Sequence, residues 1–143
     1  MSLRSDRVYV SHMRDAARKV MRFTKDITYE DFLDDEEKQW AVIRGIEIIG
    51  EACKKISAEF IDAHPEFPWK HMIGMRNVLI HNYANVDLLI VWTAIGEDLP
   101  NLNRLARAVL GRERARQPGT DNLSHAQSPR RPHAGEERPE LDR

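Results

Sequence analysis

The sequence predicts an all-α fold, an antiparallel bundle of four to five helices followed by a disordered polar tail. Apolar residues recur at spacings of three and four through most of residues 1–111, as they do on one face of a helix. No segment alternates apolar and polar residues like a strand, and no Asn-Gly pair marks a hairpin. Residues 112–143 contain few large apolar side chains, so a helical domain over 1–111 and a disordered tail over 112–143 are expected.

The first expected helix ends near Lys25 and shows one apolar face. That face consists of Tyr9, Met13, Ala16, Ala17, Val20 and Phe23. A short turn follows, in which Thr28 and Asp31 have the spacing of a capping box.

A second, longer helix is expected to open at Asp34 and to end before the two prolines of residues 64–69. Its buried stripe would comprise Val42, Ile43, Ile46, Ile49, Gly50, Cys53, Ile56 and Phe60. A third helix would begin with Pro68 at its first position and end within 81–83. Asn85 or Asp87 can cap a fourth helix, which Pro100 is expected to break or kink.

Composition excludes several classes of function. The 22 Lys and Arg residues nearly balance 23 Asp and Glu residues, and a net charge of −1 does not draw the whole protein to nucleic acid or to an anionic membrane. The single cysteine, Cys53, cannot form an internal disulfide and is expected to fill the core in a reducing compartment. No apolar run reaches the ~18–20 residues of a membrane span, and no signal peptide is visible, so a cytoplasmic protein is expected.

Arg76 stands in the middle of an apolar stripe of the third helix. On a helical wheel, the residues within about 60° of it are Trp69, Met72, Ile73, Leu79, Ile80 and Tyr83. An arginine there needs a carboxylate, a carbonyl or an anionic ligand, or else a wet interface. Asn77 and His81 share an edge about 100–140° away. Convergence of the three therefore requires the helix to end near His81, or a second copy of the helix.

A purely structural explanation fits the same residues. Arg76 could pair with Glu47 or Glu51 of the second helix, His81 could cap the third helix, and Tyr83 could pack in the core. Spacing alone leaves both explanations open.

Three segments together resemble the HepT-like toxins of the HEPN superfamily. They are RGIEIIGEACKKIS (44–57), HPEFPWKHMIGMRNVLIHNY (64–83) and VDLLIVWTAIGEDLP (86–100). The family motif is an Arg, four variable residues, a His, one residue and a Tyr, which here is Arg76, His81 and Tyr83. The resemblance covers about residues 9–110 and implies a helical homodimer with the Arg and His of both protomers in one cleft.

The resemblance implies a metal-independent endoribonuclease without a cofactor, the toxin of a type VII-like toxin–antitoxin system. His81 would act as general base or acid on the ribose 2′-hydroxyl, since an imidazole can pass a proton near neutral pH. Arg76 would stabilise the charge of the transition state, and Asn77 would orient the phosphate or the histidine. The products would carry 2′,3′-cyclic phosphate and 5′-hydroxyl ends.

Tyr83 matches the position at which a cognate nucleotidyltransferase antitoxin, MntA-like, AMPylates such toxins. The added phosphates would compete for the charges that RNA needs. Glu51 or Glu47 could support Arg76, although Glu51 could equally be a surface carboxylate on the rim of the site. The expected partners are RNA, the antitoxin and a second copy of the chain, with no membrane and no metal, since no His pair has zinc-ligand spacing.

Two other hypotheses remain open. The chain could be a non-catalytic dimer that binds a nucleotide or a nucleotidyltransferase partner, or a purely structural helical dimer. His81 separates them from the nuclease, because only catalysis requires an ionisable imidazole at this position.

Overall fold

A computed structural model describes the backbone of residues 3–115 and the side chains of residues 5–111. The described residues are helical and contain no strand, which confirms the predicted all-α class. The helices are α1 (Leu3–Phe23), α2 (Tyr29–Leu33), α3 (Glu36–Lys55), α4 (Ala58–Ala63), α5 (Trp69–His81) and α6 (Leu88–Ala115). None of these helices is long and apolar enough to cross a membrane.

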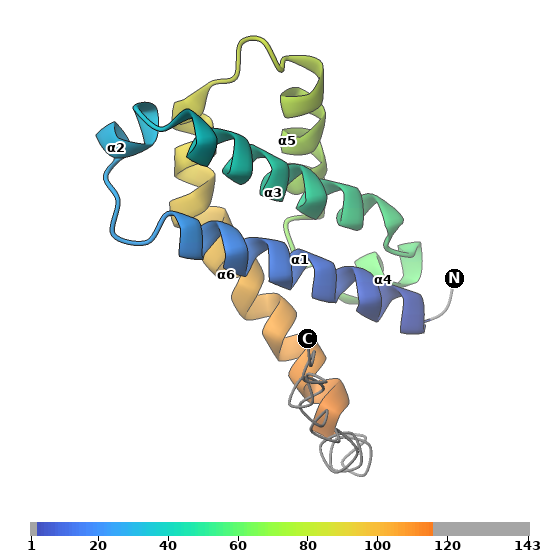
Figure 1. Cartoon of the computed structure of the whole chain (residues 1–143). Coiled ribbons are helices and arrows are strands. Elements are labelled where there is room, and N and C mark those ends of the chain that lie inside the picture. Colours follow the sequence, from blue (N-terminus) through green and yellow to red (C-terminus); the bar gives the residue numbers. More distant parts are fainter. Residues whose placement is uncertain (1–2, 116–143) are drawn as a thin grey trace, which may run out of the picture. The chain divides into compact units, whose positions relative to one another are not determined.

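Helix α3 is the centre of the compact unit Met1–Gly111, with α1 packed along one side and α5 along the other (Figure 1). Helix α6 crosses behind them, and its Val91, Leu99 and Leu102 are fully buried in the same core. Short helix α2 adds Phe32, whose ring lies 5.3 Å from that of Trp92, centroid to centroid. The core therefore includes residues of all four long helices, and α3 packs directly against α1 and α5.

Two glycines of α3 allow these close contacts. A Cβ atom on Gly45 would lie 2.3 Å from Cγ2 of Val20 on α1. A Cβ atom on Gly50 would lie 2.2 Å from Cβ of Arg76 on α5 and 2.9 Å from the carbonyl oxygen of Met72. Each glycine weakens an isolated helix by about 0.5–1 kcal/mol relative to alanine. Here the missing side chains bring α1 and α5 against the backbone of α3.

Local signals for helix starts are largely confirmed. Thr28 and Asp31 form the predicted capping box, with N–H···O distances of 3.1 and 3.0 Å. Asp87 caps α6 by accepting a hydrogen bond from the backbone N–H of Leu89 at 3.0 Å. The N-cap of α3 is Asp35, one residue later than the predicted Asp34.

The predicted second helix is wrong at its C-terminal end. It ends at Lys55, because Ile56 leaves the helical conformation with a ψ of 140° and Ser57 caps the separate helix α4, which carries Phe60. The buried carboxylate of Asp6 accepts hydrogen bonds from the backbone N–H and the hydroxyl of Ser57, at 2.8 and 2.6 Å. These bonds hold Ser57 outside the helix and replace the hydrogen bonds of a continuous one.

Two further details differ from expectation. Pro68 is the N-cap of α5 and not its first helical residue. Pro100 does not break α6, which continues to Ala115, so the first four residues of the predicted tail are helical. Pro100 is exposed while Leu99 and Leu102 are fully buried, and their packing outweighs the proline penalty of about 3 kcal/mol. The remainder of the predicted disordered tail lies outside the described residues.

Candidate functional site

Arg76 lies where α5 comes closest to α3. Met72 and Leu79 on the same helix are buried in the core, whereas the Arg76 side chain remains 17% exposed. Its aliphatic stem packs against the bare backbone at Gly50. Because the stem is confined there, the guanidinium group is directed to the rim between α3 and α5.

The guanidinium group has two partners within the chain. Its Nη2 donates a short hydrogen bond and forms an ion pair with Oε1 of Glu51 on α3. Its Nη1 donates to Oδ1 of Asn77 at 3.0 Å. Among the described residues the buried Nε–H has no acceptor. A guanidinium carries five N–H donors, and because the Nε–H is buried, one N–H on each Nη atom remains for another group.

The ion pair changes the acidity of Glu51. The hydrogen bond from Arg76, with the positive charges of Arg76, Lys54 and Lys55, holds the pKa of the Glu51 carboxyl below its usual value of 4.5 against a smaller opposing effect of desolvation. Glu51 is therefore ionised at neutral pH and available to hold Arg76. Glu47, the other carboxylate considered, contacts Arg44 at 3.5 Å instead.

His81 is the last residue of α5 and is exposed. Its ring makes no hydrogen bond or ion pair with the described part of the chain. The helix stops here because Asn82 leaves the helical conformation, with φ of −113° and ψ of 36°, after its backbone N–H has donated to the carbonyl of Val78 at 2.9 Å. The end of α5 at His81 is the first of the two arrangements that convergence of Arg76, Asn77 and His81 required.

Tyr83 follows in the turn after α5 and is 82% exposed. The helical wheel placed it on the apolar stripe, but the chain leaves the helix at Asn82 and turns the tyrosine away from the core. Its ring lines a hollow of about 310 Å³ together with Trp40 and Leu79. Trp40 is itself 73% exposed.

Two residues around the candidate site, Gly50 and Trp40, were not predicted from the sequence as parts of it. Gly50 was expected only as part of a buried stripe, and its role under Arg76 depends on how α5 crosses α3. Trp40 precedes the predicted stripe and carried no signal except being a large aromatic residue on a polar turn of the helix.

Within residues 5–111 no three His, Cys, Asp or Glu side chains cluster in a way that could hold a metal ion.

Burial distinguishes Cys53 from a reactive thiol. Its side chain is 1% exposed among apolar neighbours, and burial raises the pKa of the thiol to about 12. Cys53 is therefore a core residue, as expected.

Comparison with known proteins identifies the family. The family model described as "Ribonuclease HepT-like" matches residues 13–109. A protein of Thermococcus cleftensis named "Probable ribonuclease HepT" is 46% identical over 99 residues, which cover 69% of this chain and 90% of that protein. A "Putative RNase" of Methanocaldococcus jannaschii is 39% identical over 104 residues, covering 73% of this chain and 95% of its own length.

A similarly named protein of Caldanaerobacter subterraneus is 35% identical over 112 residues, covering 78% of this chain and all of its own. No solved structure matches the chain significantly. The family match spans all the helices that surround Arg76, so the predicted family and the ribonuclease class of enzyme are confirmed. This chain belongs to the HepT-like ribonucleases of the HEPN superfamily.

Proposed function

We propose that this protein is the toxin of a toxin–antitoxin pair and that it cleaves RNA without a metal ion. The observation that carries the proposal is the partly buried Arg76, held by Glu51 and Asn77, on the same helix as the exposed His81. These residues occupy the motif positions of a HepT-like ribonuclease. Arg76 keeps two Nη–H donors for a phosphate, and the ring of His81 has no hydrogen-bond partner among the described residues.

The proposed reaction is transesterification within the RNA. An imidazole nitrogen of His81 takes the proton of the ribose 2′-hydroxyl, and the resulting oxygen attacks the adjacent phosphorus. The bond from phosphorus to the 5′-oxygen of the next nucleotide breaks, that oxygen takes a proton from solvent, and His81 gives the proton it accepted back to solvent. The products are a 2′,3′-cyclic phosphate and a 5′-hydroxyl.

Arg76 would stabilise the extra negative charge on the phosphorus during this step. Glu51 and Asn77 fix the guanidinium before substrate arrives, so little reorganisation is needed when charge develops. Residues five apart on a helix are separated by about 7.5 Å along its axis, a distance that a phosphodiester with its ribose can bridge. Asn77 lies between them and would align Arg76 through the 3.0 Å hydrogen bond.

A homodimer is part of the proposal. The α5 side of α3 exposes Trp40 (73%), Ile80 (36%) and Tyr83 (82%), an unusual amount of apolar and aromatic surface beside a polar site. Pairing two copies through this surface would cover it and would bring two sets of Arg76 and His81 into one cleft.

Regulation would act through Tyr83. Its exposure leaves the hydroxyl accessible to a nucleotidyltransferase, which would join the tyrosine oxygen to the α-phosphate of ATP with release of pyrophosphate. AMP on Tyr83 would place negative charge and bulk beside the end of α5. A mass increase of one or more AMP groups after treatment with the partner and ATP, absent in Tyr83→Phe, tests this step.

The test of the nuclease is cleavage of unmodified RNA by purified protein in EDTA, with the product ends identified. His81→Ala is expected to abolish cleavage, because it removes the proton acceptor while changing only an exposed side chain. His71→Ala is the matched control. His71 lies on the same helix and is 54% exposed. Its ring contacts Asp98 on α6, at 2.8 Å between Nε2 and Oδ2, and not Arg76.

Cyclic phosphate ends that appear with wild type and His71→Ala, and vanish with His81→Ala, support the proposal. Cleavage that survives in His81→Ala refutes the role of the histidine. An unmodified wild-type protein that cuts no RNA would favour the non-catalytic dimer, in which Tyr83 is modified but His81 is dispensable.

A further inference from the structure

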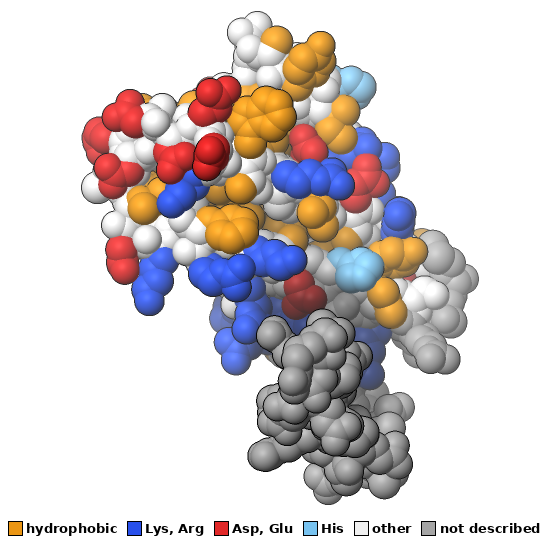
Figure 2. All heavy atoms as spheres, viewed as in Figure 1, with side chains coloured by type: hydrophobic (Ala, Val, Ile, Leu, Met, Phe, Trp, Pro, Cys, Tyr) orange, Lys and Arg blue, Asp and Glu red, His pale blue; other side chains and the backbone are white. Residues whose placement is uncertain are grey.

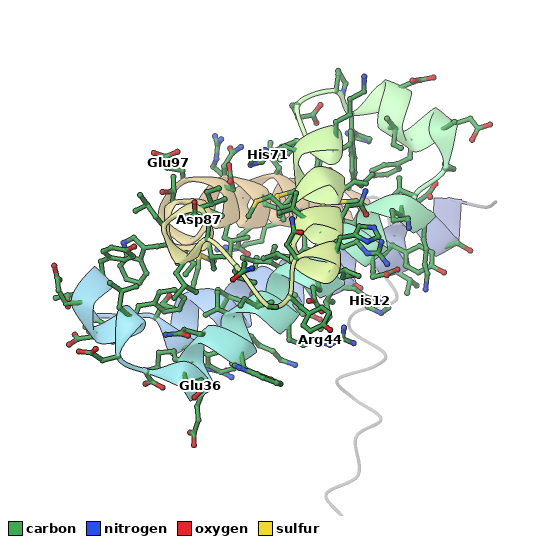
Figure 3. All side chains as sticks on the ribbon, turned by 90° about the horizontal axis from the view of Figure 1, so that it is seen from above. His12, Glu36, Arg44, His71, Asp87 and Glu97 are labelled. Atoms are coloured by element: carbon green, nitrogen blue, oxygen red, sulfur yellow. The ribbon has the colours of Figure 1, made fainter. Side chains whose placement is uncertain are left out.

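Two neighbouring hollows lie between α1 and α3. Their volumes are about 460 and 340 Å³. Both are lined by His12, Arg44 and Ile48, so they form one continuous depression, which we call the α1–α3 groove. Figure 3 shows His12 and Arg44 on one side of the molecule, with His71, Asp87 and Glu97 on the opposite side.

Basic side chains outnumber free carboxylates along the groove. Lys19 lines its first hollow and Lys55 its second. Arg44, 68% exposed, lines both hollows and contacts Glu47 at 3.5 Å. The two carboxylates that line it are already engaged: Asp15 pairs with Arg14 at 3.0 Å, and Glu51 pairs with Arg76.

Basic side chains also gather over α1 in Figure 2, whereas the acidic ones gather over α2 and the start of α3. Although the whole chain has a net charge of −1, this face would attract a polyanion.

The groove leads to the candidate site. Glu51 lines the second hollow and accepts a hydrogen bond from Arg76 through Oε1, so the groove ends at the carboxylate that positions the arginine. At the same end the ring of Tyr9 lines the hollow, with Nζ of Lys55 5.7 Å from the ring centroid. Tyr9 and Lys19 are ten residues apart on α1, which gives the groove a length of about 15 Å.

We propose that the α1–α3 groove binds the single-stranded RNA that continues from the cleaved phosphodiester. The inference rests on the proposed nuclease function and adds to it a substrate class and a path. Lys19, Arg44 and Lys55 bind successive phosphates, and His12 donates a hydrogen bond to the backbone. Cationic grooves with an aromatic side chain are a general means of holding single strands without reading their sequence.

The aromatic ring in the groove favours single strands. An unpaired base can stack on Tyr9, whereas a base inside an A-form duplex cannot. The hollow on the far side, between α5 and α6, is a poorer candidate. It is lined by Lys70 and His71, but His71 is paired with Asp98 and the acidic Asp87 also lines that hollow.

The experiment measures binding and not cleavage. The probe is a labelled single-stranded RNA with 2′-O-methyl groups throughout, which cannot undergo 2′-hydroxyl attack, and its dissociation constant is followed by anisotropy at several salt concentrations. Lys19→Ala and Lys55→Ala are each expected to weaken binding several-fold. Each should also reduce the slope of log K against log salt by about 0.7, the value for one lost phosphate contact on a single strand.

Lys70→Ala is the matched control, since it removes an exposed lysine from the opposite face. Lys19→Arg and Lys55→Arg should keep the wild-type slope, which separates loss of charge from loss of packing. Three outcomes would refute RNA binding in the groove. They are an unchanged slope in both alanine variants, an equal loss of affinity in Lys70→Ala, and no binding of the probe by wild type. Failure of the nuclease itself would appear separately, as wild-type protein that binds this probe but cuts no unmodified RNA.

Discussion

Replacing Gly50 with alanine is the sharpest structural test of the site, because it adds one methyl group beneath Arg76. That methyl carbon would lie 2.2 Å from Cβ and 2.8 Å from Cγ of Arg76. It would also lie 2.9 Å from the carbonyl oxygen of Met72. Cβ of Arg76 and the Met72 carbonyl are fixed to the α5 backbone, so no side-chain rotation can relieve the contact.

The size of the effect follows from these distances. Carbon atoms pack favourably at about 3.5–4.0 Å, so α5 has to move away from Gly50 of α3 by at least about 1.3 Å. Overpacking of this kind costs about 1–3 kcal/mol, and the better helix propensity of alanine returns about 0.5–1 kcal/mol. A net loss of up to about 2.5 kcal/mol is expected, at about 4 °C of melting temperature per kcal/mol for a domain of this size. Displacement of a positioned group by about 1 Å can lower kcat/KM by about 100-fold.

Thermal unfolding and RNA cleavage measure the two effects separately. Gly74→Ala and Gly96→Ala are controls of equal chemistry, because nothing lies within 4 Å of a Cβ at either position and both should stabilise the protein slightly. Gly45→Ala crowds Val20 on α1 instead, so it should lower stability without moving Arg76, and it serves as a control for stability alone because Gly45 lines the proposed groove. A Gly50→Ala protein with wild-type stability and activity would refute the argument that Gly50 sets the position of Arg76.

Three further predictions concern single side chains. Because the pKa of Glu51 is lowered in the folded state, its stabilising effect is present above pH 4.5 and is lost as the pH falls through the lowered pKa. In Glu51→Gln the free energy of unfolding should therefore fall less steeply with decreasing pH in the acid range than it does in wild type. Asp6→Ala leaves the N–H and hydroxyl of Ser57 without their buried acceptor and should lower the free energy of unfolding in urea by about 1–3 kcal/mol. With a pKa near 12, the Cys53 thiol should not react with a thiol reagent at pH 8 until the protein is unfolded, and labelling of native protein at the rate of the unfolded chain would contradict its burial.

The features that the sequence predicted correctly depend on nearby residues. The capping box of Thr28 and Asp31 needs only three residues of separation, and the apolar face of α1 needs only a helical period. The break after Lys55 could not be predicted in this way. Ile56 and Phe60 both continue the apolar stripe, and the bonds that end the helix come from Asp6, 51 residues earlier in the chain.

The candidate site shows the same division. The sequence placed Arg76 on an apolar stripe and required a partner for it, and both statements follow from the helical period alone. Which carboxylate becomes the partner depends on the rotation of α3 against α5. Glu51 lies at the level of Gly50 along α3 and reaches the guanidinium of Arg76, whereas Glu47 lies one turn earlier and contacts Arg44. The exposure of Tyr83 also escaped the wheel, because the wheel does not show where a helix ends.

Helix α3 links the proposed reaction to the proposed RNA path. It carries Gly50 and Glu51 toward α5, where they confine and bind Arg76, and it carries Arg44 and Lys55 along the α1–α3 groove. A change in the position of α3 against α5 would therefore disturb the arginine before it disturbs the groove. Gly50→Ala should lower the rate of cleavage much more than the affinity for 2′-O-methyl RNA, whereas Lys19→Ala should do the reverse. Equal losses of rate and affinity in both variants would show that the groove and Arg76 do not act as separate parts of one site.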